Sequence, residues 1–575
     1  MRRALPCPRL LPLALVLLAL PALVRTAGRE ARAEEKAPRA PHAREVRSTP
    51  AMPTSAWRKD APGATPERGD TALLTLISDV DSLNPYTSSS ADASYIQDMI
   101  FPRLMEEQAD YYDGPPSFTP QVALSWKPGE DGLSWRFTLR ECTWSDGVPI
   151  TAEDLRFAWE AARHPAVGWV SASIVDFIAD VEVHGPREVT VRFTERYPYQ
   201  LMDINDVHIL PKHVFGKVPF EQWQKVGSWE EQARTSGGPW LLERVVANQE
   251  VSLVRNPRWW EPGKPYLDRV VWKVQGNMET NLNALLAGDV DTMMSVLPKD
   301  AGRVLADEDV LLYTYVTRAM GWIGWNTRKA PFDDARVRRA MTHAIDRENI
   351  VESIWYGYAQ VAAPIVIRSM WASDRSLQPL EFDPDAAERL LDEAGWKRGA
   401  DGVRAKDGAR LAFPLVTNAG NEVRKKVCEY VQANLREVGV EVEIRLQDFN
   451  QMSTQLKKHN FDAFVGGMNF ATKVDGKPIF HSSAADGRFN YVDFRDARVD
   501  AIIDQARLMG DKEAARPLWA EMQRIFHEQQ PYTPLYEPRG LVAIHKRFRN
   551  VNVTSLRPTH NLHEWWVPKA EQKVK

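Results

Sequence analysis

The sequence contains few cysteines, which limits how far covalent cross-links can hold its fold together. Only three occur in 575 residues, at Cys7, Cys142 and Cys428. Cys142 and Cys428 are so far apart in the chain that their spacing gives no evidence for a disulfide. Two separate buried thiols are favoured. A disulfide in an oxidising compartment is the alternative.

An excess of charge of one sign is also missing. The 73 basic residues nearly balance the 77 acidic ones, and the formal net charge is −4. This balance excludes a bulk attraction to nucleic acid or to an anionic membrane surface. A small neutral ligand or a protein partner fits better. After the N-terminal segment, no stretch reaches the roughly 18 uncharged apolar residues of a membrane helix.

Signatures of catalysis are absent too. The chain has no G-x-S-x-G elbow, no H-E-x-x-H pair, no phosphate-binding loop and no dinucleotide fingerprint. The best candidate for a metal is His560 with His563 and Glu564, but such a group near a C-terminus is more often a solvated surface. We therefore expect no catalytic residue, no bound metal and no cofactor.

The N-terminus has the layout of a secretory signal peptide. Three arginines within the first nine residues precede an uncharged apolar run at residues 10–24, which is too short to span a bilayer comfortably. The small residues Ala31 and Ala33, separated by one residue, predict cleavage after residue 33, and the stretch ending at Ala27 is a rival site. Cys7 lies before the apolar run, so we expect no lipid anchor. These features predict an exported, periplasmic protein.

Residues 34–69 hold six prolines and alternating charges without a helical or strand period. This composition predicts a flexible tether. Ordered structure is expected to begin at Thr71, because residues 72–77 are typical of a buried strand.

The remainder, about 540 residues, is too long for one hydrophobic core and mixes helix and strand patterns. Alternation predicts strands at 135–139, 189–193 and 440–446. Capping residues and apolar spacing predict helices that begin after Thr151, span 336–346, follow Asp383, and cover 427–438. No repeat of 20 to 50 residues is present. The mixture predicts α/β lobes.

Several blocks in fixed order resemble the family 5 solute-binding proteins of ABC importers, the group with oligopeptide-, dipeptide- and nickel-binding members. The resemblance spans about Leu73 to the C-terminus, and each block alone is weak. The blocks are WRFTLR (135–140), WSDGVPITAED (144–154), SGGPW (236–240), RNP (255–257), LLAGDVD (285–291), WNT (325–327), PFDDARVRRA (331–340) and AIDR (344–347).

The resemblance implies a two-lobed α/β fold with a central cleft, a hinge and a subdomain inserted in the first lobe. We call residues 70–99, 233–320 and 540–575 the core of lobe I, residues 100–232 its inserted subdomain, and residues 321–539 lobe II. Closure about the connecting strands would bury a ligand between the lobes.

The ligand residues implied by the resemblance depart from the peptide-binding pattern. Peptide-binding members carry a Gly-Trp-x-x-Asp stretch whose aspartate pairs with the peptide amino group. The matching stretch here contains Met468, Asn469, Phe470 and, in place of the acid, Ala471. A free amine would lose its charge partner, at a cost of a few kcal/mol in a desolvated cleft. Asp475 is a possible substitute.

Position in the chain adds further candidates for ligand contact. Loops that follow the strands of open α/β sheets often line ligand sites, and Tyr86, Ser88 and Ser90 follow the first strand of lobe I. Near the expected hinge, Trp322, Trp325 and Asn326 begin lobe II. For each residue, a role in the core or in a turn is the alternative.

The sequence thus predicts a monomeric substrate-binding component of an ABC import system. It would capture a peptide-like or other small solute and deliver it to a membrane permease, without nucleic acid. Two alternatives are an exported hydrolase of peptides or glycans, and a ligand-sensing protein on the same scaffold.

Overall fold

The computed structural model describes residues 55–61, 63–486 and 488–573. The predicted signal peptide and residues 34–54 lie outside the described residues. Among the helices described, none combines the length and the apolar character that a bilayer crossing requires.

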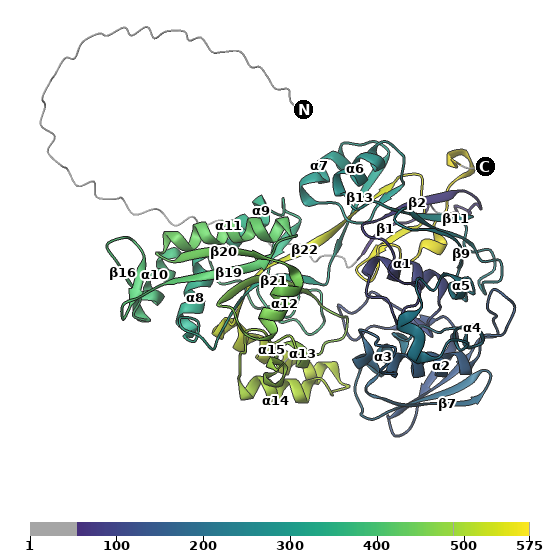
Figure 1. Ribbon diagram of the computed structural model, residues 1–575, viewed down its shortest axis with the longest axis horizontal. Coiled ribbons are helices and arrows are strands. Elements are labelled where there is room, and N and C mark those ends of the chain that lie inside the picture. The colour runs from purple at the N-terminus through teal and green to yellow at the C-terminus, as the bar shows by residue number, and fades with distance from the viewer. Residues whose placement is uncertain (1–54, 62, 487, 574–575) are drawn as a thin grey trace, which may run out of the picture. The chain divides into compact units, whose positions relative to one another are not determined.

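A four-stranded sheet forms the centre of lobe I (Figure 1). Its first strand is the predicted buried strand, and it pairs in parallel with β11, with Leu74 opposite Trp272. Both of these side chains are completely buried, so the pairing fixes the register through one apolar face. In spatial order the strands are β2 (Thr71–Leu76), β11 (Arg269–Val274), β10 (Glu250–Arg255) and β9 (Trp240–Val246).

The inserted residues 100–232 contain a second four-stranded antiparallel sheet and a small strand pair. The predicted strands at 135–139 and 189–193 are confirmed as neighbours in this sheet, and the predicted helix after Thr151 is confirmed with its capping box to Asp154. The elements are β5 (Ala123–Pro128), β6 (Ser134–Leu139), β8 (Glu188–Phe193), β7 (Ile178–Gly185), the pair β3 (Met105–Glu107) and β4 (Phe118–Pro120), and α2 (Ala152–Arg163).

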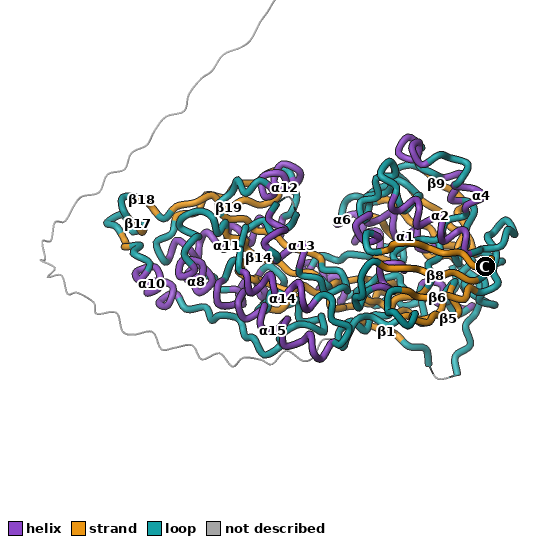
Figure 2. The backbone as a smooth tube through the Cα atoms, turned by 90° about the horizontal axis from the view of Figure 1, so that it is seen from below, coloured by secondary structure: helices purple, strands orange, loops and turns teal. Residues whose placement is uncertain are grey.

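Lobe II is built on the other large sheet, which includes β14 and β19 (Figure 2). Strands β19 and β20 of this sheet are parallel. Helices α8 and α11 bury their apolar stripes with this sheet in one cluster, where Val337, Met341 and Val431 are fully buried. The three predicted helices of this region are confirmed as α8 (Ala335–Ala344), α10 (Pro384–Glu393) and α11 (Glu422–Glu437), and the predicted strand as β20 (Glu441–Gln447). The same sheet contains β14 (Ala319–Trp325), β19 (Ala412–Asn418) and β21 (Ala463–Asn469).

Long strands connect the two lobes. β22 (Tyr532–His545) pairs with β14 through its first residues and with β13 (Val310–Val316) through its last ones. Because β13 runs into β14 after only Thr317 and Arg318, two chain passages run side by side here (Figure 1). Two short strands, β12 (Thr292–Met293) and β15 (Ala359–Val361), also pair with β22.

The other elements complete the two lobes. They are α1 (Ala91–Ile100), α3 (Gln200–Asn205), α4 (Lys212–Phe215), α5 (Glu230–Ala233), α6 (Met278–Leu286), α7 (Ala301–Leu305), α9 (Arg347–Ser353), α12 (Phe449–Lys457), α13 (Lys477–Phe480), α14 (Ala497–Ala506), α15 (Lys512–Gln529), β16 (Lys397–Arg398), β17 (Arg404–Lys406) and β18 (Ala409–Arg410).

The structure differs from the expected tether at its C-terminal end. Strand β1 (Ser55–Arg58) pairs antiparallel with β23 (Val551–Thr554), and the Glu67 carboxylate accepts a hydrogen bond from the backbone N–H of Lys569. The sequence of this segment shows no strand period. Its order comes instead from pairing with β23, which lies almost 500 residues away in the chain.

The buried apolar residues do not divide by lobe as simply as the predicted boundaries would suggest. One cluster is confined to lobe II, whereas the largest one runs from Leu74 through Tyr111 and Trp371 to Trp519 and thus includes both lobes. The lobe boundaries remain a prediction. Two separate buried thiols are confirmed: Cys142 and Cys428 are free, and burial raises their pKa to about 11 and about 12.

Candidate functional site

The loop that follows β21 lies directly against lobe I. The Thr472 hydroxyl donates a 2.6 Å hydrogen bond to the carboxylate of Glu107 at the end of β3. The Lys473 ammonium lies 3.0 Å from the carboxylate of Asp203 in α3, and near the face of the Tyr197 ring. Two successive residues of lobe II therefore reach two carboxylates of the inserted subdomain.

These carboxylates belong to an acidic cluster, which we define as Glu107, Asp203 and Asp206. Burial is the largest influence on the pKa of each group. It raises the pKa of Glu107 and of Asp203, and it raises the pKa of Asp206 to about 7. Arg103, 3.6 Å from Asp206, and Lys473 act in the opposite direction. The cluster thus places three carboxyl groups where the two lobes meet, and burial makes each of them easier to protonate than in water.

A second contact between the lobes is aromatic. The Trp371 indole N–H donates to the Tyr199 hydroxyl oxygen at 3.2 Å, and the Trp371 backbone N–H donates to the carbonyl of Tyr111. The Arg375 guanidinium lies 3.6 Å from the centre of the Tyr112 ring. These contacts explain why the largest buried cluster continues from one lobe into the other.

The candidates after the first strand have structural roles in the turn. Tyr86 is 1% exposed, packs on Trp169 and Trp223, and donates its hydroxyl hydrogen to the carbonyl of His208. Ser88 donates to Asp81, and Ser90 caps α1. Because these side-chain groups are already engaged, the alternative role is favoured for all three.

The candidates near the hinge are also interior residues. Trp325 is completely buried, packs on Phe332 and donates its indole N–H to Thr533. Asn326 is equally buried and donates to the carbonyls of His459 and Phe461. We remove both from the candidate set, since neither has a polar group left for a ligand. Trp322 is 3% exposed and packs on Phe470 and Tyr532.

The remaining candidates lie on or beside the loop that contacts lobe I. Met468 and Phe470 are half-buried, whereas Asn469 is exposed. The expected substitute acid, Asp475, is already paired within lobe II: the Arg507 guanidinium lies 3.3 Å away, and the Lys477 backbone N–H donates to it. It therefore does not replace the missing acid at Ala471.

Sequence reasoning did not find the acidic cluster or Lys473. Glu107, Asp203 and Asp206 carry no recognisable motif, and they come together only because β3 and α3 pack side by side. Their one local signal is that Met202 and Ile204 make α3 apolar around Asp203.

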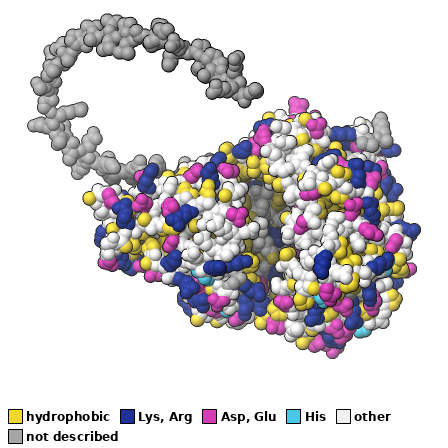
Figure 3. Space-filling model, viewed as in Figure 1, with side chains coloured by type: hydrophobic (Ala, Val, Ile, Leu, Met, Phe, Trp, Pro, Cys, Tyr) yellow, Lys and Arg dark blue, Asp and Glu magenta, His cyan; other side chains and the backbone are white. Residues whose placement is uncertain are grey.

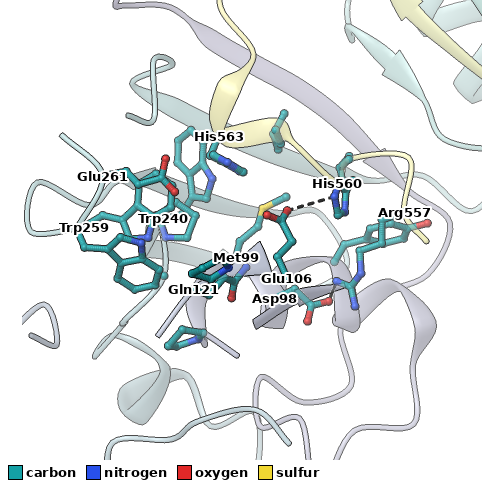
Figure 4. Close-up of a pocket in the computed structure, with 18 residues that line it drawn as sticks. Asp98, Met99, Glu106, Gln121, Trp240, Trp259, Glu261, Arg557, His560 and His563 are labelled. Carbon is teal, nitrogen blue, oxygen red and sulfur yellow. Dashed lines mark ion pairs between the residues drawn. The ribbon is translucent and has the colours of Figure 1, made fainter. Parts of the chain in front are cut away.

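A cavity of about 100 Å³ lies elsewhere in lobe I, among α1, β3 and the C-terminal residues 557–563 (Figure 4). His560 lines it and lies 3.2 Å from Glu106, and burial lowers the pKa of His560 to about 4. The expectation of a solvated surface at His560 and His563 is therefore wrong, because the loop folds back onto β3. No group of three metal-ligating side chains occurs in the part of the chain that the structure describes.

Comparison with known proteins places the chain in a family. A model of the bacterial extracellular solute-binding proteins, family 5 Middle, matches residues 117–490. The chain belongs to family 5 of these solute-binding proteins. The family is extracellular, and the two-lobed α/β fold expected from the sequence is confirmed.

Individual relatives agree with the family. The oligopeptide-binding protein AppA of Bacillus subtilis is 27% identical over 511 residues, which is 88% of this chain and 93% of AppA. The structure of AppA in complex with a nonapeptide superposes with a TM-score of 0.74 at 26% identity, over 88% of this chain and all of AppA. The nickel-binding periplasmic protein of Escherichia coli is 24% identical over 474 residues, 79% of this chain and 87% of that protein.

The family 5 assignment identifies the role as substrate binding in an import system. The hydrolase and sensor alternatives are not favoured. Figure 3 shows acidic and basic side chains mixed over the visible face, which suits capture of a small solute better than recognition of a polyanion.

Proposed function

We propose that this family 5 protein captures a short peptide or a peptide-like solute with a basic group between lobes I and II, and delivers it to an ABC permease. The observation that carries the proposal is the acidic cluster. It places carboxyl groups beside the loop in which Ala471 replaces the amine-binding aspartate, and a bound cation would favour their charged forms.

The charge partner of the ligand would thus lie on lobe I instead of lobe II. Asp206 is suited to this role because Arg103, at 3.6 Å, is its one ion-pair partner within 4 Å among the described residues. A cation that reaches Asp206 would relieve the repulsion among the three carboxylates and favour their charged forms. Glu107 adds a carboxylate whose other partner, Thr472, comes from the opposite lobe.

The contacts between the lobes would act as a latch around the bound solute. Thr472 to Glu107 and Lys473 to Asp203 each join one residue of lobe II to one of lobe I, so they form only when the lobes are close. We infer that the hinge lies where β13, β14 and β22 pass between the lobes. Met468, Asn469 and Phe470 remain proposed ligand contacts, because they border this loop.

The proposal assigns no catalytic step to the chain. We also infer that residues 1–33 are removed on export and that the protein acts as a periplasmic monomer, since the ligand site needs no second copy.

The direct test compares tetra-alanine with its N-acetylated form by isothermal titration calorimetry and thermal unfolding. A ligand at 100 times its Kd stabilises the folded protein by about 2.7 kcal/mol, so we expect the free-amine peptide to raise the Tm. Acetylation or Asp206→Asn should each weaken binding by roughly 2–5 kcal/mol, because both remove one member of a desolvated charge pair.

Two results would contradict the proposal. One is equal affinity for the free and the acetylated peptide. The other is an affinity that Asp206→Asn leaves unchanged. Glu153→Gln is the matched control, because Glu153 pairs with Lys212 on the surface of the inserted subdomain and should not affect binding.

A further inference from the structure

The cavity in lobe I is separate from the contact between the lobes. Its lining comes from residues 95–121, 238–261 and 557–563, and none of it from lobe II. Figure 4 shows Trp240 and Trp259 on one side of the cavity and Glu106, His560 and Arg557 on the other. The cavity therefore has an aromatic wall opposite a polar one.

Glu106 is the acid of the polar wall that has no lysine or arginine within 4 Å among the described residues. Asp98 is paired with Arg557 and Arg103, and Lys264 lies between Glu261 and Glu564 at 2.9 and 2.7 Å. Among the described residues, Glu106 has His560 as its one ion-pair partner within 4 Å. Burial keeps that imidazole neutral at pH 7, because its pKa falls to about 4. Burial raises the pKa of Glu106, and among the described residues no lysine or arginine lies within 4 Å of it, so a cation in the cavity would favour its charged form.

The aromatic wall adds an unused hydrogen-bond donor. Trp259 lines the cavity, and its buried indole N–H has no hydrogen-bond partner among the described residues. A buried donor without a partner costs free energy unless a bound molecule accepts its hydrogen. The ring of Trp259, which is half-buried, can also attract a cation through its ring electrons.

We propose that this cavity is a second ligand site, which binds a small organic ammonium ion that also carries a hydrogen-bond acceptor. The ammonium contacts Glu106, the acceptor meets the Trp259 N–H, and the hydrocarbon part lies against the indole rings. The volume of about 100 Å³ suits a molecule of roughly four to eight non-hydrogen atoms, such as an amino alcohol.

The site borders the proposed peptide site without sharing its residues. Successive residues of a strand point to opposite faces, so β3 directs Glu106 to the cavity and Glu107 to Thr472 of lobe II. A ligand in the cavity would contact the same strand as the latch, from its other face.

The test titrates the purified exported protein with 2-aminoethanol and follows the tryptophan indole N–H resonances by NMR. The resonance that is missing in Trp259→Phe identifies Trp259. We expect this resonance to shift with 2-aminoethanol, and to shift much less with ethylene glycol, which lacks the charge, or with glycolate, which reverses it.

Variants locate the ammonium. Glu106→Gln should weaken binding of 2-aminoethanol at least tenfold, whereas Glu141→Gln, an exposed acid of the same lobe, should leave it unchanged. The proposal is overturned if the Trp259 resonance does not shift, if ethylene glycol shifts it equally, or if Glu106→Gln binds as the wild type does. The comparison of the three probes stands even if Glu106→Gln does not fold. The Trp259 resonance reports on this cavity, whereas Asp206→Asn tests the site between the lobes, so the two proposals can fail separately.

Discussion

Glu537 illustrates how burial sets the charge state of one side chain. It lies in the middle of β22, is 6% exposed, and accepts hydrogen bonds from the Gln360 side chain and the Arg368 backbone N–H. Burial outweighs these bonds and raises its pKa to about 7. Asp206 is raised to about 7 for the same reason.

The raised pKa values of these two carboxyl groups predict that the free energy of unfolding decreases as the pH rises. Between about pH 4 and pH 7 the folded protein keeps protons that the unfolded chain has released, so the contribution of each group falls through this window. Glu537→Gln should flatten part of the decline and make the variant more stable than the wild type at pH 8, by up to roughly 3 kcal/mol. Urea unfolding at several pH values measures the difference.

The exposed Glu528→Gln provides the comparison for this residue. It should leave the pH dependence unchanged. A Glu537→Gln curve parallel to that of the wild type between pH 4 and pH 8 would show that Glu537 is already ionised in the folded protein.

At the scale of elements, the pairing of β22 with β13 brings the backbone of one strand close to an aromatic side chain of the other. Gly540 pairs with Tyr315, and a Cβ added at Gly540 would overlap the Tyr315 ring. The ring therefore covers the glycine. A methyl group at Gly540 would force the Tyr315 ring to move, at the point where the two strands connect the lobes.

We expect Gly540→Ala to destabilise the protein by about 1–3 kcal/mol through overpacking. In a Tyr315→Ala background the same change should cost much less, because the clashing ring is gone, and a double-mutant cycle in urea measures this coupling. Gly227→Ala serves as control, since no atom lies within 4 Å of the position that its new methyl group would take. Additive effects of Gly540→Ala and Tyr315→Ala would contradict the argument.

The elements were predictable where the signal is local. The helices at α8, α10 and α11 follow from apolar spacing and from caps such as Asp383, whose side chain accepts from Ala386 N–H. Strand β1 was not predictable, because its partner β23 lies at the other end of the chain.

The site was predictable only in part, because most of its contacts join residues that are far apart in the chain. The stretch at 467–471 marks the loop near lobe I, but sequence position does not distinguish a buried Trp325 from a residue that lines a cleft. The acidic cluster depends on the packing of β3 against α3 and on Lys473 from lobe II, which no local pattern encodes.

At the scale of the whole molecule, one guanidinium joins three distant parts of lobe I. Arg547 donates to Asp70, to both carboxylate oxygens of Asp291, and to the carbonyl of Thr71, and all three charged side chains are nearly inaccessible. The first strand, the middle of the chain and the C-terminal return thus meet at one buried triad.

Removing the side-chain charge of Arg547 should destabilise lobe I more than breaking an ion pair on the surface would. Arg547→Met removes the guanidinium that pairs with both buried carboxylates, so we expect a loss of about 3–5 kcal/mol in urea unfolding. Arg136→Met, which breaks an exposed pair with Glu188, should cost under about 1 kcal/mol. Equal effects of the two variants would mean that the triad does not hold these segments together.

The proposed closure of the lobes involves the latch pair of Lys473 and Asp203, so a change at Lys473 should shift it. Lys473→Met leaves Asp203, which is 1% exposed, with the Tyr197 hydroxyl as its remaining side-chain donor among the described residues. Because Lys473 is partly exposed, we expect a cost to closure of about 1–3 kcal/mol. Small-angle scattering of the ligand-free variant should then give a larger radius of gyration than that of the wild type.

The matched variant is Lys477→Met, in which the lost ion pair with Asp504 lies within lobe II. It should leave the radius of gyration unchanged, because no contact to lobe I is lost. If Lys473→Met scatters as the wild type does, then the aromatic contact of Trp371 with Tyr199 is enough to hold the lobes together, and the ion pair is a consequence of closure instead of a cause.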